Sequence, residues 1–137
     1  MNPSTLLLAG ILLLALVTVE SGGWFLTRVS RGHHDANALQ TSFFRAGHAH
    51  AGVLLVLSIA ILGLIDAARL DGAWMTVARL GVPVAAILMP AGFFLSVLGR
   101  DPQRPNRLIA LVWVGALCLT AGLVTAGVGL IRAGVTG

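Results

Sequence analysis

Four long apolar stretches limit the folds that this chain can adopt. They run roughly over residues 4–29, 42–67, 73–98 and 106–131. Each is longer than the about 20 residues that an α-helix needs to cross a hydrocarbon core of about 30 Å. A water-soluble domain would need a polar face on most of its elements, and these stretches are too long and too uniform to supply one. The sequence therefore predicts an all-α, polytopic membrane protein whose residues 1–137 form a single membrane domain.

The connections between the stretches indicate how the helices are arranged. Residues 30–41 are polar, whereas the connections 68–72 and 99–105 are short. Short connections join neighbouring helices that run in opposite directions, so we expect an antiparallel four-transmembrane-helix bundle. The composition agrees, because 57% of the residues are hydrophobic and 10% are charged, against about 45–50% and about 25% in soluble domains.

Arginine placement predicts the orientation in the cell membrane. All nine basic residues are arginine, and the formal net charge is +4. Six lie in or near the first and third connections: Arg28, Arg31, Arg45, Arg100, Arg104 and Arg107. The other three lie on the opposite side of the membrane: Arg69, Arg79 and Arg132. Positively charged connections favour the cytoplasm, so the first and third connections are expected there and both termini outside. The basic charge reflects this topology and contact with lipid headgroups, and no nucleic-acid partner is expected.

Ionisable residues inside the spans are the candidates for function. A charged side chain at the bilayer centre costs about 2.5–3.5 kcal/mol on insertion scales, so each one needs an explanation. At about 1.5 Å per residue, Glu20 should lie about 13 Å from the cytoplasmic end of the first helix, and His48 about 9 Å from that end of the second. Trp113 of the fourth helix is expected in the same layer. Asp66 and Arg79 lie near helix ends, where their side chains can reach the headgroups.

Helical spacing selects the residues that share a face. Arg45 and His48 lie three positions apart on one face of the second helix, whereas His50 points about 200° away from His48. The sequence predicts a polar pocket formed by Glu20, Arg45 and His48, with Trp113 beside it. Such a pocket could bind a metal ion, a proton or a small polar ligand near neutral pH, with transport as one use. Alternatively, these groups form an interhelical ion pair that only fixes packing.

A second candidate is a metal site near the first connection. Imidazole and carboxylate groups are ligands for divalent ions such as zinc, copper or nickel. The residues concerned are His33, His34, Asp35, His48 and His50. Because His48 and His50 diverge on a regular helix, they cannot both bind one ion. Solvated loop histidines are the alternative interpretation.

Two further functions stay open at this stage. A membrane-embedded enzyme acting on an apolar substrate would use His48 or Glu20 as its general acid or base. An accessory or structural subunit would use its small residues to pack against a partner helix. The fourth span has such residues along one face: Gly115, Gly122, Ala126, Gly129 and Ala133. A homo-oligomer or a larger membrane complex through this face is therefore an expectation, although the packing partner could equally be a helix of the same chain.

Overall fold

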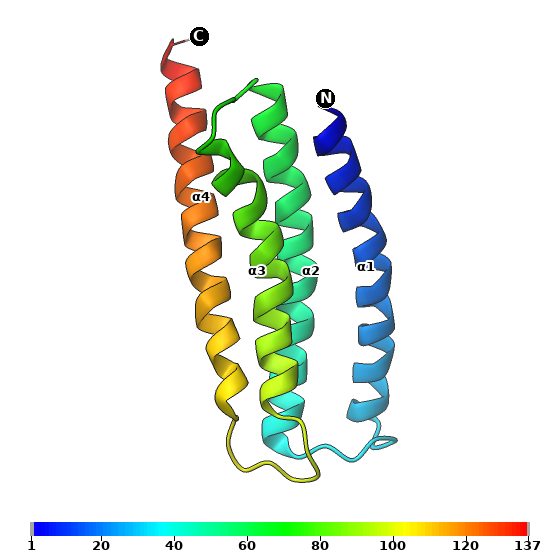
Figure 1. The fold of residues 1–137 in the computed structure, drawn as a ribbon. Coiled ribbons are helices and arrows are strands. Elements are labelled where there is room, and N and C mark those ends of the chain that lie inside the picture. The colour runs from blue at the N-terminus through cyan, green and yellow to red at the C-terminus, as the bar shows by residue number, and fades with distance from the viewer. Residues whose placement is uncertain (1, 137) are drawn as a thin grey trace.

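The computed structural model describes residues 2–136, which form four long α-helices and no strand (Figure 1). The helices are α1 (Pro3–Ser30), α2 (Ala38–Ala67), α3 (Met75–Ser96) and α4 (Ala110–Thr136), with a single 3₁₀ turn, η1 (Arg107–Ile109), before α4. All four spans are long and apolar enough to cross a membrane. The prediction of an all-helical chain with four membrane-spanning lengths is confirmed.

Local capping explains where the helices begin. α2 starts at Ala38, earlier than predicted, because Asn37 and Gln40 form a reciprocal capping box that satisfies the first backbone donors. The Gln40 amide is buried and also donates to the carbonyl oxygens of Val97 and Gly99. α4 starts later than predicted because Asn106 caps η1 instead.

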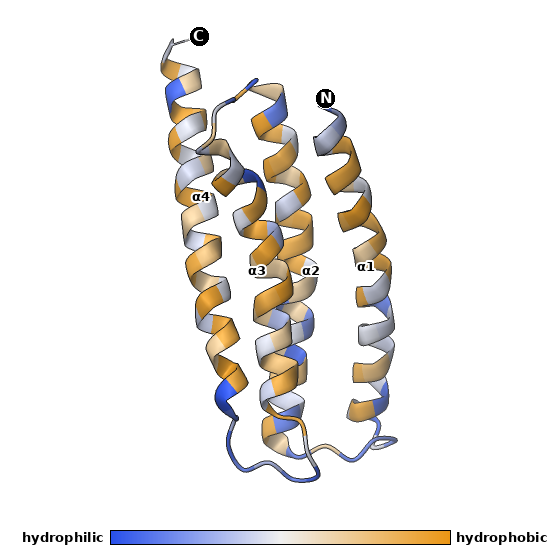
Figure 2. Cartoon of the chain, viewed as in Figure 1, coloured by the Kyte–Doolittle hydropathy of each residue, from blue (hydrophilic) through white to orange (hydrophobic). Residues whose placement is uncertain are grey.

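The connections gather at two ends of the bundle (Figure 1). Both chain ends and the α2–α3 connection lie at one end, here called the terminal end; the other two connections lie at the opposite, loop end. Hydrophilic residues concentrate in these connections, and hydrophobic residues dominate between them (Figure 2). Hydrogen bonds join chain segments at each end: Asn2 N donates to Asp66 at the terminal end, and Asn37 Nδ2 donates to Asp101 at the loop end.

Helix α3 forms the centre of the core. It packs extensively against α4 and α2, and its Val82 and Ala85 are completely buried. The contact with α4 is a backbone contact, because a β-carbon added at Gly81 would lie only 2.7 Å from Gly122 Cα. Small residues allow helices in membranes to approach in this way.

This contact identifies the neighbour of the small-residue face of α4. Gly115, Gly122, Ala126 and Gly129 are buried, and β-carbons added at Gly115 and Gly122 would meet Met89, Gly81 and Val82 of α3. The face is therefore occupied by a helix of the same chain. A homo-oligomer or larger complex remains a prediction, and it would have to use a different face.

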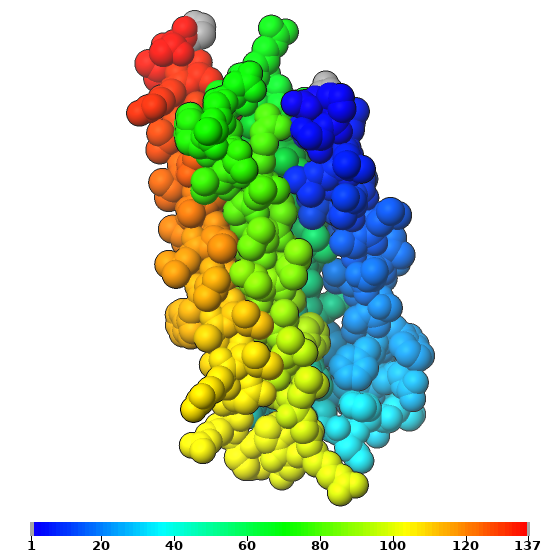
Figure 3. Space-filling model, viewed as in Figure 1, coloured from blue at the N-terminus to red at the C-terminus, as the bar shows by residue number. Residues whose placement is uncertain are grey.

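Helix α1 packs least tightly. Its buried residues are Thr5, Leu12 and Val29, and it contacts mainly α2. The space-filling view shows it along one side of the molecule, next to α3 at the terminal end (Figure 3). Most of its apolar surface is therefore available to lipid or to another molecule.

Candidate functional site

In the described chain, no hydrogen bond or ion pair joins the side chains of the pocket predicted from the sequence. His48 is half-buried and faces α1, where a β-carbon added at Gly22 would lie 3.2 Å from its Nδ1 atom. Arg45 donates to Ser30 Oγ at 3.3 Å, at the last residue of α1. Glu20 is exposed, and no hydrogen bond or ion pair joins its side chain to another residue of the described chain. Trp113 is 70% exposed on the outer face of α4.

The proposed metal ligands do not come together in one group within the described residues. His50 Nδ1 is 2.8 Å from the Ala46 carbonyl oxygen, and the His34 ring lies edge-on to Phe25 at 5.2 Å. His33 and Asp35 are exposed in the first connection. Within residues 2–136, no group of three or more His, Cys, Asp or Glu side chains is placed to hold a metal ion. The structure therefore does not gather the five residues into one ligand set.

The close contact between His48 and α1 leads to a first prediction. We expect Gly22→Val to destabilise the protein by about 1–3 kcal/mol, because the added side chain would displace the His48 ring. Gly10→Val is the control on the same helix, since a β-carbon at Gly10 would meet nothing within 4 Å. Thermal unfolding in detergent measures both effects. Equal melting temperatures for the two variants would contradict the expectation.

A polar cluster joins three helices at the terminal end. Thr5 of α1 is 1% exposed, and its Oγ1 donates to Asp66 Oδ1 of α2 at 3.3 Å. Thr5 Oγ1 also accepts a hydrogen bond from Arg79 NH1 of α3, at 3.0 Å. Arg79 NH2 also donates to the Leu70 carbonyl oxygen at 3.4 Å. These bonds hold the half-buried guanidinium between α1 and the α2–α3 connection.

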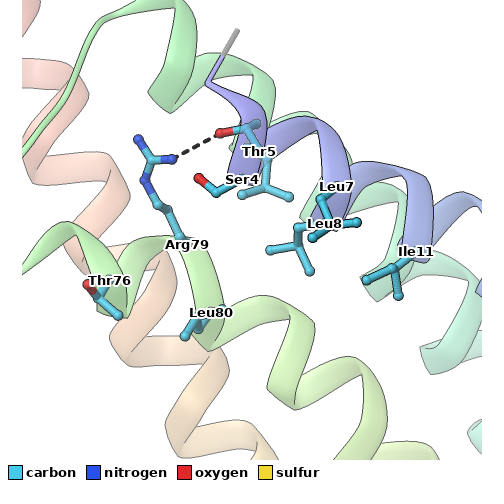
Figure 4. Close-up of a pocket in the computed structure, with 9 residues that line it drawn as sticks. Ser4, Thr5, Leu7, Leu8, Ile11, Thr76, Arg79 and Leu80 are labelled. Carbon is cyan, nitrogen blue, oxygen red and sulfur yellow. Dashed lines mark hydrogen bonds between the residues drawn. The ribbon is translucent and has the colours of Figure 1, made fainter.

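An apolar pocket of about 350 Å³ adjoins this cluster. Figure 4 shows Leu7, Leu8 and Ile11 along α1, Leu80 on α3, and Arg79 with Thr5 at one end. The buried Leu62 of α2 also lines it. The pocket is therefore bounded by three helices, with hydrocarbon along its length and a cation at one end.

Two polar pockets adjoin the apolar pocket at Arg79. A pocket of about 220 Å³ shares Ser4, Thr76 and Arg79 with the apolar one. A further polar pocket of about 350 Å³ is lined by Asn2, Asp66, Arg69, Leu70, Asp71 and Arg79. Arg79 lines all three spaces, so the apolar pocket and the two polar ones adjoin at this residue. These three adjoining spaces are here called the groove.

The α2–α3 connection shapes the polar part of the groove. The amide groups of Arg69 and Leu70 donate to the carbonyl oxygens of Asp66 and Ile65, which is a Schellman ending of α2. Arg69 occupies the left-handed position of this motif, with φ of 51°. Glycine is usual there because it lacks a β-carbon. An arginine thus occupies a backbone position that favours glycine, at the wall of the polar pocket.

Sequence reasoning placed Asp66 and Arg79 at the headgroups and did not connect them. A usable signal was present, because Thr5, Asp66 and Arg79 each lie within about one turn of a helix end on the same side of the predicted bundle. The predicted antiparallel arrangement would bring such ends together. The sequence offered no means, however, of showing that their side chains point toward each other.

Comparisons with protein-family models, with curated protein sequences and with solved structures found no match to this chain.

Proposed function

We propose that the protein is an antiparallel four-transmembrane-helix protein that binds a small amphipathic molecule in the groove between α1 and α3. The observation that carries this proposal is the position of Arg79, which lines both the apolar pocket and the polar pockets next to it. Small-molecule sites are typically apolar cavities of about 300–1,000 Å³ with a few polar groups that fix orientation. A molecule with a hydrocarbon tail and a polar head matches this distribution.

Arg79 is suited to hold the polar head. A guanidinium group has five N–H donors, and within the described chain two hydrogen bonds from Arg79 are formed, to Thr5 and Leu70. The remaining donors are available to oxygen atoms of a ligand. Arginine recognises carboxylate and phosphate groups through this geometry.

The groove opens where lipid would surround the helices. Ile11 and Leu7, which line it, are 54% and 68% exposed. Counting arginines puts the loop end in the cytoplasm and both termini outside. On that basis the groove lies in the outer leaflet of the cell membrane, and its ligand enters from the bilayer.

Blocking the apolar pocket tests the proposal. We expect single-chain amphiphiles, such as lysophospholipids, to raise the melting temperature of protein purified in an uncharged maltoside detergent, because a ligand that binds only the folded state stabilises it. Ile11→Trp should abolish this shift by filling the pocket.

Leu14→Trp is the matched control for this test. Leu14 lies on the same helix, is 72% exposed and does not line the pocket. The Leu14→Trp variant should keep the wild-type response to each amphiphile. If both tryptophan variants respond like the wild type, the groove is not the binding site.

An accessory-subunit function is the second candidate, and Glu20 is the observation that favours it. This carboxylate is exposed at membrane depth and makes no hydrogen bond or ion pair within residues 2–136. An unpaired charge in the hydrocarbon is costly, and a partner helix with a basic or hydrogen-bonding group would reduce that cost. If no amphiphile stabilises the protein, this function becomes the leading one.

A further inference from the structure

Charged side chains of both signs line the polar pocket. Arg69 and Arg79 contribute two positive charges, and Asp66 and Asp71 contribute two negative charges. A ligand head with a single charge would be attracted by one pair and repelled by the other. A head group that carries a positive and a negative charge can be attracted by both the arginine pair and the aspartate pair.

The charges are also ordered along the groove. Arg79 is the charged residue that lines the apolar pocket as well as the polar ones. Asp71 lines only the polar spaces, is exposed, and forms no hydrogen bond or ion pair within the described chain. The cation therefore lies next to the tail, and an unpaired carboxylate lies farther from it.

We infer that the ligand is a zwitterionic phospholipid, with its phosphate at Arg79 and its terminal ammonium group at Asp71. This inference rests on the proposed function of the groove. In such a lipid the phosphate is attached close to the hydrocarbon chains, and the ammonium group is at the outer end of the head. That order matches the order of the two side chains.

The alternative head chemistries fit less well. An anionic head without an ammonium group would satisfy Arg79 but leave Asp71 facing a net negative ligand. A cationic amphiphile would place its charge beside the Arg79 guanidinium, at the junction with the apolar pocket. Each arrangement places like charges near each other, which is unfavourable.

Three amphiphiles with the same chain length test the inference on the full-length protein. They are lysophosphatidylethanolamine, which is zwitterionic, lysophosphatidylglycerol, which is anionic, and an alkylamine, which is cationic. Their affinities are compared from the rise in melting temperature during titration in maltoside detergent. We expect the zwitterion to bind most tightly to the wild type. Asp71→Asn should weaken its binding by about two- to fivefold, the range for an exposed ion pair, and should leave the anionic lipid unaffected or favoured.

The controls separate this inference from the function on which it rests. Asp35→Asn removes an exposed carboxylate at the loop end and should keep the wild-type preference. The inference is overturned if the anionic lipid binds the wild type as tightly as the zwitterion and Asp71→Asn changes neither affinity, although amphiphile binding itself would then stand. If none of the three compounds stabilises the wild type, the proposed function fails as well.

Discussion

Gly81→Ala is expected to destabilise the protein by about 1–3 kcal/mol or more, because the added methyl group would force α3 and α4 apart and disrupt the packing between them. The added β-carbon would lie 2.7 Å from the Cys118 carbonyl oxygen and 2.7 Å from Gly122 Cα. Both are backbone atoms of α4, so no side-chain rotation can relieve the overlap. α3 and α4 would have to move apart along the most extensive interface of the bundle. Thermal or denaturant unfolding in detergent measures the loss.

Gly127→Ala is the matched control for this prediction. Gly127 lies on α4, and a β-carbon there would meet nothing within 4 Å. Alanine forms helices better than glycine by about 1 kcal/mol. This variant should therefore be as stable as the wild type or slightly more stable. Similar losses in the two variants would show that glycine matters at these positions for some reason other than close packing.

Arg79→Met is expected to weaken amphiphile binding by about tenfold or more, since hydrogen bonds to charged groups contribute about 1.5–3 kcal/mol. Methionine keeps much of the apolar stem and removes every donor. The change also leaves Thr5 Oγ1 and the Leu70 carbonyl oxygen without the bonds that Arg79 donates to them. A lower melting temperature in the absence of ligand is therefore expected too, and ligand titration separates the two effects.

Two other variants make the Arg79 experiment specific. Arg132→Met removes an exposed arginine of α4 at the terminal end and should leave both binding and stability close to wild type. Arg79→Lys keeps the positive charge but loses the planar set of donors, so it should bind with intermediate affinity. A folded Arg79→Met protein that binds amphiphiles like the wild type would exclude Arg79 as the headgroup ligand.

The pocket predicted from Glu20, Arg45 and His48 shows where local sequence pattern stops being informative. The His48 prediction identified a residue in a helix interface, and its ring does lie against α1. Its expected partner, Glu20, has an exposed side chain. Successive residues of an α-helix point in directions about 100° apart, so Glu20 and the preceding Val19 face different ways. Val19 is the residue that a β-carbon at Gly52 of α2 would meet, at 3.9 Å. A difference of one residue in the rotation of α1 therefore decides whether Glu20 lies inside or outside.

The number of spans was determined by the sequence alone, because hydrophobicity over about 20 residues is a local property. The small residues of α4 likewise predicted a close-packed face before its neighbour was known. Only the tertiary structure brought Thr5, Asp66 and Arg79 together at the terminal end. The physical reason is that these helices are apolar on nearly every side, so amphipathicity does not fix their rotation. Packing of small and large side chains between helices fixes it instead, and that depends on all four helices at once.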